Sequence, residues 1–280
     1  MSLIDLRNVS FTYAGGSKPS ITEITLRVEK GEFVVLTGPS GCGKTTLCRI
    51  LNGLVPNFYS GALAGEARIA GLDIREHPTS TLAKVVGFVF QNPDNQLFSL
   101  SVERDVAFGP ENLGLTREEI RKRVEWALAS TGTEQLRDMA PYELSGGQQQ
   151  RVAIASVLAM QPEVMVLDEP TSFLDPKSSE RILEVVEKLH RELGVTVVMV
   201  EHRLDLVSRF ADRVVVMDAG RIVLDGPPSK VYGEQAYLIG IGLPRVTLLF
   251  DLLRKDGINV TGSPVTVEEA AAELRRVLRR

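Results

Sequence analysis

The sequence predicts an α/β fold in which helices flank a parallel sheet. Short runs rich in valine, isoleucine and phenylalanine are almost continuously apolar, as expected of strands covered on both faces. They occupy residues 33–36, 85–90, 164–167, 195–200 and 214–217. Segments with helical periodicity lie between them, at residues 44–51, 117–129, 148–160 and 178–193. Because strand and helix signals alternate, we expect an α/β core.

The two ends of the chain depart from this alternation. Residues 4–11 and 21–28 alternate apolar and polar side chains around a Gly-Gly turn, which predicts an antiparallel edge sheet. A Gly-Pro-Pro sequence at 226–228 marks a boundary. Beyond it the chain is mostly helical, and its last helix opens at Thr266 with Glu269 three residues later, the spacing of a capping box.

Composition and charge narrow the class of protein. The chain has 280 residues, a formal net charge of −4, and 44% hydrophobic residues. A protein with a net negative charge does not attract polyanions in general, so we expect no nucleic acid partner. Along one helix Cys42 and Cys48 would lie roughly 9 Å apart, too far for a disulfide, so we expect reduced thiols. No signal peptide and no apolar run of the roughly 18 residues of a membrane span are found, so any membrane role is expected to be peripheral.

A glycine-rich loop follows the first core strand and opens the next helix. It matches the phosphate-binding pattern GxxxxGK[ST] in the strand-to-helix context that the motif requires. Glycines let backbone N–H groups converge on phosphate oxygens, and the helix N-terminus adds a favourable dipole. Lys44 would neutralise the β and γ phosphates, and the Thr45 hydroxyl can ligate Mg²⁺. The alternative is an ordinary glycine-rich turn. The residues of the loop are Gly38, Pro39, Ser40, Gly41, Cys42, Gly43, Lys44, Thr45 and Thr46.

Two acids end the apolar run at residues 164–167. Asp168 would hold the Mg²⁺ shell. Glu169 would act on the attacking water as general base, a role typically worth ~10²–10⁴-fold in rate. The alternative for this pair is a solvated acidic loop after a core strand.

A second anion-binding nest is expected where a Ser-Gly-Gly turn leads into a helix. That helix runs to about residue 160, which places the nest roughly 20 Å from the end leading to the Asp168 strand. The nest should therefore close over nucleotide held by a partner subunit, unless it is a plain helix cap. Its residues are Leu144, Ser145, Gly146, Gly147 and Gln148.

These motifs together resemble ATP-binding cassette ATPases. The order of phosphate loop, Gln91, the LSGGQ nest, the Asp168-Glu169 pair and His202 is similar to that family over about residues 1–228. The loop and these side chains each follow a predicted strand, and ligands of open parallel sheets bind at that edge.

The resemblance implies a domain organisation. We expect a P-loop core of RecA-like type over residues 1–228, with an N-terminal antiparallel β subdomain and an α-helical signature subdomain at about 92–160. Residues 229–280 would form a small helical C-terminal extension used in dimerisation.

The resemblance also assigns roles to single residues. Tyr13 would stack on adenine, and Gln91 would sense Mg²⁺ and water. His202 would contact the γ-phosphate and orient the catalytic acid, and Asp175 would communicate across a dimer. Phe173 departs from the small residue usual in that loop. The alternatives are an ordinary strand aromatic for Tyr13, a solvated loop amide for Gln91 and a structural histidine for His202.

Residues 90–98 and 105–112 resemble the energising subunits of energy-coupling-factor importers, which take up vitamins and transition-metal ions. Residues 243–280 resemble their C-terminal extension. The resemblance implies ATP and Mg²⁺ as cofactors, and it implies a second ATPase subunit, identical or paralogous, as a partner. It also implies an integral membrane coupling subunit, a substrate-binding membrane subunit and a peripheral position at the cytoplasmic face of the membrane. The alternatives are the ATPase of another importer class, a non-transport cassette protein acting on ribosomes or DNA, a scaffold that does not hydrolyse, and a phosphate-loop kinase or GTPase.

Residues 92–98 follow Gln91 directly. We hypothesise that they form, with the helix from about Glu103, the docking groove for the membrane subunit. Leu97 and Phe98 would supply its apolar surface. The alternative is that both side chains pack inside the helical subdomain.

Overall fold

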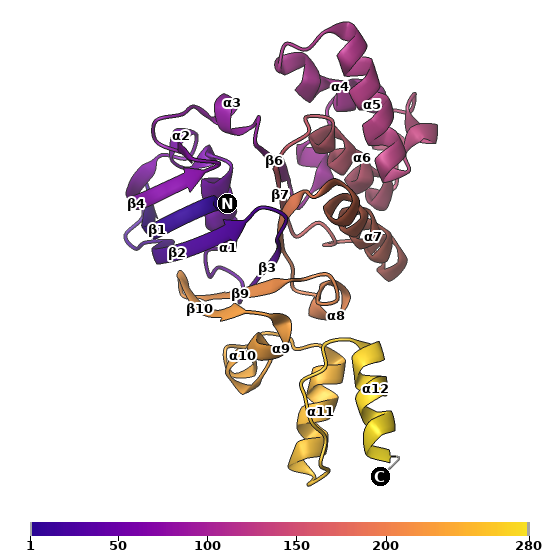
Figure 1. The fold of residues 1–280 in the computed structure, drawn as a ribbon. Coiled ribbons are helices and arrows are strands. Elements are labelled where there is room, and N and C mark those ends of the chain that lie inside the picture. Colours follow the sequence, from indigo (N-terminus) through magenta and orange to yellow (C-terminus); the bar gives the residue numbers. More distant parts are fainter. Residues whose placement is uncertain (1, 279–280) are drawn as a thin grey trace.

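A six-stranded sheet forms the centre of the computed structural model, which describes residues 2–278 (Figure 1). Its strands are β3 (Phe33–Thr37), β6 (Val86–Val89), β7 (Val164–Asp168), β8 (Thr196–Val200), β9 (Arg213–Asp218) and β10 (Arg221–Gly226). Their order across the sheet is β10-β9-β3-β8-β7-β6. All neighbours are parallel except β10, which pairs antiparallel with β9.

The predicted parallel sheet is confirmed, and each predicted strand differs from the observed one by at most one residue at either end. Strand β10 was not predicted. Its side chains alternate between exposed and half-buried positions, so it lacks a continuous apolar run.

Helices surround the sheet. Those predicted at residues 44–51, 117–129, 148–160 and 178–193 correspond to α1, α5, α6 and α7, with bounds shifted by at most two residues. The helices of the first 207 residues are α1 (Lys44–Leu51), α2 (Leu54–Asn57), α3 (Thr79–Leu82), α4 (Val102–Asn112), α5 (Arg117–Thr131), α6 (Gly146–Leu158), α7 (Pro176–Leu193) and α8 (Leu204–Val207), with the 3₁₀ helices η1 (Pro93–Asn95), η2 (Glu134–Leu136) and η3 (Pro141–Glu143).

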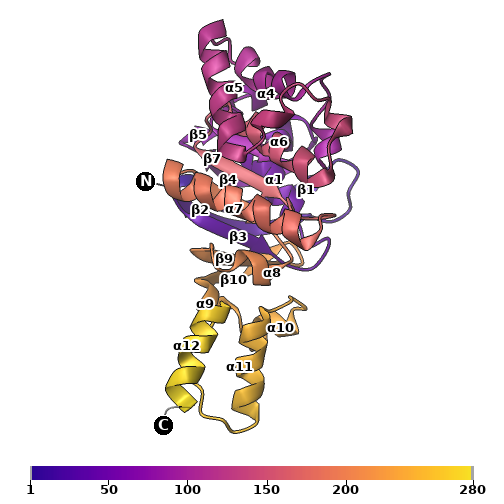
Figure 2. The same cartoon turned by 90° about the vertical axis from the view of Figure 1, so that its right-hand side faces the viewer.

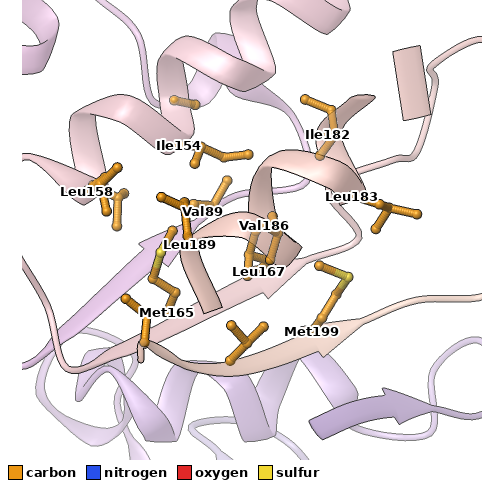
Figure 3. Close-up of a cluster of buried hydrophobic side chains, with 14 of the residues drawn as sticks. Val89, Ile154, Leu158, Met165, Leu167, Ile182, Leu183, Val186, Leu189 and Met199 are labelled. Atoms are coloured by element: carbon orange, nitrogen blue, oxygen red, sulfur yellow. The ribbon is translucent and has the colours of Figure 1, made fainter. Parts of the chain in front are cut away.

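Different elements cover the two faces of the sheet. Met165 and Leu167 of β7 pack with side chains of α6 and α7 in the cluster of Figure 3. Val164 and Val166 of the same strand belong to a second cluster, formed with α1 and the N-terminal strands. Because side chains alternate along a strand and both faces are covered, every residue of β7 is buried. This explains the continuous apolar runs of the sequence.

An antiparallel sheet lies on the α1 side of the core (Figure 1). It consists of β1 (Ser2–Tyr13), β2 (Ile21–Glu29), β4 (Gly61–Ile69) and β5 (Leu72–Asp73), in the order β2-β1-β4-β5. The predicted pairing of the first two strands is confirmed. Strands β4 and β5 were not predicted, because β4 keeps few of its side chains buried.

The C-terminal part contains α9 (Pro228–Val231), α10 (Glu234–Leu238), α11 (Arg245–Lys255) and α12 (Val267–Leu278). Helices α11 and α12 lie side by side (Figures 1 and 2), and a small core forms there from Phe250, Ala270 and Val260 of the connecting segment. The capping box of the last helix is confirmed. The Glu269 N–H donates to the Thr266 hydroxyl at 3.2 Å, and the Glu269 carboxylate accepts from the Thr266 N–H.

Buried apolar side chains and hydrogen bonds tie this part to the core. The Ser208 hydroxyl donates to the Tyr232 hydroxyl at 2.9 Å, and the Arg245 N–H donates to the Asp205 carboxylate at 2.6 Å. The proposed division into domains stays a prediction. Within residues 2–278, none of the helices combines the length and the apolar character needed to cross a bilayer.

Candidate active site

The phosphate loop connects β3 to α1 and packs closely against neighbouring segments of the chain. Gly43 precedes α1 with φ of 108°, and a Cβ there would lie 2.6 Å from the Ser20 carbonyl oxygen. A Cβ at Gly38, with φ of 150°, would lie 2.1 Å from the Met217 carbonyl oxygen. Both positions therefore require glycine.

Lys44 spans the loop. Its side chain is buried, and its Nζ donates to the carbonyl oxygens of Gly38 at 2.8 Å and Pro39 at 2.9 Å. These bonds hold the ammonium group over the loop, where the predicted phosphates would bind.

A cavity of about 530 Å³ opens beside this loop. The phosphate-loop residues Ser40, Gly41 and Gly43 to Thr46 line it together with Glu169. The sequence did not predict four further lining residues, Pro19, Ser20, Ala219 and Gly220. The Asp-Ala-Gly-Arg sequence does indicate a hairpin turn at Gly220, but only the fold brings that turn to the loop, where the Gly220 N–H donates to the Cys42 carbonyl oxygen at 3.0 Å.

Asp168 ends β7, directly before the cavity-lining Glu169, and is only 7% exposed. Burial raises the pKa of this carboxyl, and a hydrogen bond with the Thr45 side chain opposes the rise. A carboxylate, a hydroxyl and the amide oxygen of Gln91 are hard oxygen ligands of the kind that Mg²⁺ prefers. A cation here would also offset the desolvation of Asp168, so these residues fit a magnesium ion.

Glu169 lies in the left-handed region with φ of 49°, which is uncommon for a residue with a side chain. Its N–H donates to the Val200 carbonyl oxygen at 3.1 Å. Its Oε1 lies 3.0 Å from Nε2 of His202, and its Oε2 accepts from Nε2 of Gln91 at 2.9 Å and from the Ser172 hydroxyl at 2.8 Å. The structure therefore brings Gln91, Glu169 and His202 together.

Strand order explains this convergence. Gln91, Glu169 and His202 follow β6, β7 and β8, which are neighbours in the sheet. Parallel neighbours end at the same edge, so three loops far apart in sequence meet at one point.

Tyr13 lies at the end of β1 and is half-buried. Its hydroxyl lies 3.2 Å from Oγ1 of Thr46 and accepts from Arg49 at 3.2 Å. Its ring meets Tyr59 edge to face at 6.3 Å between centroids. Tyr13 is thus anchored to α1 beside the phosphate loop, but it is not among the residues that line the cavity. Its stacking role stays a prediction.

The LSGGQ nest lies away from the phosphate-loop cavity and lines none of it. Leu144 is buried, whereas Ser145 is exposed and precedes α6. Gln148 accepts at Oε1 from the Ser145 N–H at 2.8 Å. A separate hollow of about 120 Å³ opens here, lined by Ser145, Gly147, Gln148, Arg151, Ser178 and Arg181.

Asp175 caps α7, accepting at Oδ1 from the N–H groups of Lys177 and Ser178, both at 3.0 Å. A hydrogen bond with the Ser178 side chain is the main cause that lowers the pKa of Asp175, and the backbone N–H bonds add to it. Phe173, two residues before it, is 89% exposed and has φ of 65°.

The structure separates Leu97 from Phe98. Leu97 is 8% exposed and belongs to the core, so its expected place in a surface groove was wrong. Phe98 is 67% exposed and meets Phe108 edge to face at 4.9 Å between centroids. Both side chains are apolar, so no local pattern decides which of the two is buried.

Comparison with known proteins identifies the family. The model of the ABC transporter family matches residues 21–172, from the start of β2 to the loop after Glu169. The chain belongs to the ABC transporter family. It is an ATP-binding cassette that hydrolyses ATP, as the sequence predicted.

Relatives cover the cassette along most of its length. An ABC transporter ATP-binding protein of Methanosarcina acetivorans is 46% identical over 275 residues, which cover 98% of this chain and 42% of the relative. The chain therefore spans less than half the length of that relative. The energy-coupling factor transporter ATP-binding protein EcfA1 of Caldanaerobacter subterraneus subsp. tengcongensis is 44% identical over 273 residues, covering 95% of this chain and 96% of the relative.

Solved structures share the fold. The cbiO1 protein of Clostridium perfringens, described as part of the ABC transporter complex cbiONQ, aligns with a TM-score of 0.76 and 37% identity, covering 89% of this chain and 99% of its own. The cassette MJ0796, solved as a dimer in a post-hydrolysis state with ADP and Pi, aligns with a TM-score of 0.69 and 32% identity, covering 80% of this chain and 98% of its own. The predicted fold class is confirmed.

Proposed function

We propose that this cassette powers an energy-coupling-factor importer for vitamins or transition-metal ions. It would act as one of two ATPase subunits, held peripherally at the cytoplasmic face of the cell membrane. The observation that carries its role as a motor is the convergence of Gln91 and His202 on Glu169 beside the phosphate-loop cavity. The importer class is supported by the EcfA1 relative, which matches over nearly its whole length.

In this proposal ATP lies between the phosphate loop of one subunit and the LSGGQ nest of the other. The exposed Ser145 and the hollow beside it supply backbone amides, a hydroxyl and the guanidinium groups of Arg151 and Arg181 for a second set of phosphate contacts. The dimeric MJ0796 structure supports such a pairing. The second subunit is either a copy of this chain or a paralogue.

The chemistry follows from the donor and acceptor atoms of the site. Lys44 and the loop amides hold the phosphates, and Thr45 and Asp168 hold Mg²⁺, which when bound neutralises charge on the transferred phosphoryl group. Glu169 accepts a proton from the attacking water. His202 holds the Oε1 side of that carboxylate, and the Gln91 amide holds the Oε2 side.

A groove of about 290 Å³ between α4, α6 and β6 is the proposed docking site of the membrane coupling subunit. Phe88, Phe98 and Phe108 contribute to its apolar lining. Asp105 also lines it, and its Oδ2 is buried without a hydrogen-bond partner among the described residues. A partner that brings apolar side chains would fill this groove.

The C-terminal extension is proposed to contact the second ATPase subunit. Leu249 and Leu252 of α11 are 43% and 59% exposed, and Val267 at the start of α12 is 67% exposed. Apolar side chains at this spacing along a helix suit burial against a second chain.

The test is co-purification of the chain with its membrane subunits in detergent, combined with ATP hydrolysis by the purified chain. Phe98→Glu should leave the melting temperature and the isolated ATPase unchanged and abolish co-purification. The matched control is Val223→Glu, an exposed apolar position on β10 (43% exposed) outside the groove, which should retain co-purification. If Phe98→Glu still assembles, the docking site lies elsewhere. If the purified wild-type chain fails to hydrolyse ATP both alone and with a paralogous cassette, the motor role fails.

A further inference from the structure

Glu201 is a buried carboxylate directly before His202. It is 3% exposed and follows the end of β8. Its Oε2 accepts from the N–H groups of His202 at 2.9 Å and Arg203 at 3.0 Å. Its Oε1 accepts from the hydroxyl of Thr171, which is itself buried. One carboxylate therefore binds two loops, the one after β7 and the one after β8.

Burial of a carboxylate is unfavourable unless hydrogen bonds satisfy it. Three donors satisfy Glu201, and two of them are backbone N–H groups that orient the chain rather than a side chain. Those bonds fix the backbone from which the His202 ring reaches Glu169. The hydrogen bonds of Glu201 therefore position His202 rather than merely fill space in the core.

The network continues from Arg203. Its guanidinium donates to the Ser179 hydroxyl at 2.8 Å, and that hydroxyl donates to the Asp175 carbonyl oxygen at 3.0 Å. Thr171 lies between Glu169 and Asp175 in the sequence. The carboxylate of Glu201 is thus bonded on one side to the loop that follows Glu169, and through Arg203 to the first turn of α7.

We propose that Glu201 is a positioning residue for ATP hydrolysis. It holds His202 at hydrogen-bonding distance from Glu169 and links this pair to the loop that ends at Asp175. The proposal rests on the catalytic roles proposed above for Glu169 and His202. Glu201 acts through His202, whose backbone N–H its carboxylate binds.

The first measurement is steady-state hydrolysis with an independent measurement of ATP affinity. Glu201→Ala should lower kcat roughly tenfold or more, as expected when a catalytic group is misplaced, and leave the ATP dissociation constant within about twofold. Glu201→Gln should restore most of kcat. Its amide oxygen can accept from both backbone N–H groups, and its NH₂ can donate to the Thr171 hydroxyl.

Two buried threonines allow an effect on the position of Glu201 to be separated from an effect on the stability of the fold. Thr171 and Thr196 are both almost fully buried, and each hydroxyl makes a hydrogen bond, Thr171 to Glu201 and Thr196 from the Gly31 N–H. Thr171→Val should lower kcat severalfold, whereas Thr196→Val should lower the melting temperature without changing kcat. Equal kcat in the two variants would contradict the proposal.

The deciding experiment is a double-mutant cycle with His202→Ala, read by single-turnover hydrolysis. If Glu201 acts through His202, Glu201→Ala should cost little further rate in the His202→Ala background. If the double variant instead loses rate by the product of the two single effects, the proposal is wrong. If Glu201→Ala does not fold, Thr171→Val replaces it in the cycle. Normal turnover of His202→Ala alone would refute the catalytic role of His202, whereas a slow His202→Ala with a normal, folded Glu201→Ala would refute only the inference about Glu201.

Discussion

Two loops of the molecule precede helices and present backbone N–H groups to the surface. They differ in how much of a binding site each one forms. The phosphate loop before α1 is enclosed by its own chain, with a buried Lys44 and a cavity of about 530 Å³ that also reaches Glu169. The LSGGQ nest before α6 is exposed at Ser145 and opens into a hollow of about 120 Å³ that has no carboxylate among its lining residues. The first loop can bind nucleotide within one subunit. The second has the groups for phosphate but lacks the rest of a site, which is the arrangement expected of a surface that completes a partner's site.

The largest effect should come from the acid beside the first loop. Glu169→Gln removes the proton acceptor but keeps the shape, so hydrolysis should fall by ~10²-fold or more while ATP affinity stays near wild type. Because ATP is then bound and not consumed, the variant should form an ATP-dependent dimer in size-exclusion chromatography. Near-normal turnover would remove Glu169 from the role of base.

The second largest effect should separate the two loops. Ser145→Arg places a bulky cation at the exposed nest, so hydrolysis should be lost while the isolated monomer binds ATP normally. Lys44→Ala removes a cation from the first loop, so monomer affinity itself should fall roughly 10- to 100-fold, as for the loss of a charged hydrogen bond. Binding can be measured with a fluorescent ATP analogue. Equal loss of monomer affinity in both variants would mean that Ser145 contacts its own subunit's nucleotide, and the contrast between the loops would be wrong.

A smaller effect concerns the pH dependence of stability at the first loop. Burial raises the pKa of Asp168, so its charged form destabilises the fold in the absence of a cation. The contribution of this group is therefore most favourable below the ordinary carboxyl pKa of about 4, and it is lost as the pH rises through the raised pKa. Asp168→Asn should melt a few degrees higher than wild type at pH 7 without metal or nucleotide, and the gain should vanish near pH 4. A variant that melts lower than wild type at pH 7 would contradict this account.

The smallest effect is expected at Asp175, near the second loop. Asp175→Ala removes the cap of α7 and should lower the melting temperature by about 2–4 °C, whereas Asp175→Asn keeps an acceptor oxygen and should not. Hydrogen bonds lower the pKa of Asp175, so its contribution is present above the ordinary carboxyl pKa and is lost as the pH falls through the lowered value. The difference between the alanine variant and wild type should therefore shrink in acid. If Asp175→Asn has a normal melting temperature but impaired hydrolysis, Asp175 also acts across the dimer.

The sequence predicted those parts of the site whose chemistry is local. The phosphate loop and the Asp168-Glu169 pair each combine a short apolar strand with the residues that must follow it, so spacing alone reveals them. The meeting of Gln91 and His202 at Glu169 needed one further principle, that parallel strands end at a common edge. Strand β10 escaped prediction because a half-exposed strand at the edge of a sheet has no continuous apolar run.

Tertiary structure alone decided which side chains surround those motifs. Gly220 reaches the cavity because the β9–β10 hairpin bonds to Cys42, a contact between residues far apart in the chain. Leu97 is buried and Phe98 exposed although they are adjacent and both apolar. In the sequence, Glu201 is a charged residue that follows a strand, with no sign of burial. In the fold, three hydrogen-bond donors surround its carboxylate. A motif specifies the groups that one short segment presents, whereas burial and hydrogen-bond partners depend on every segment packed around it.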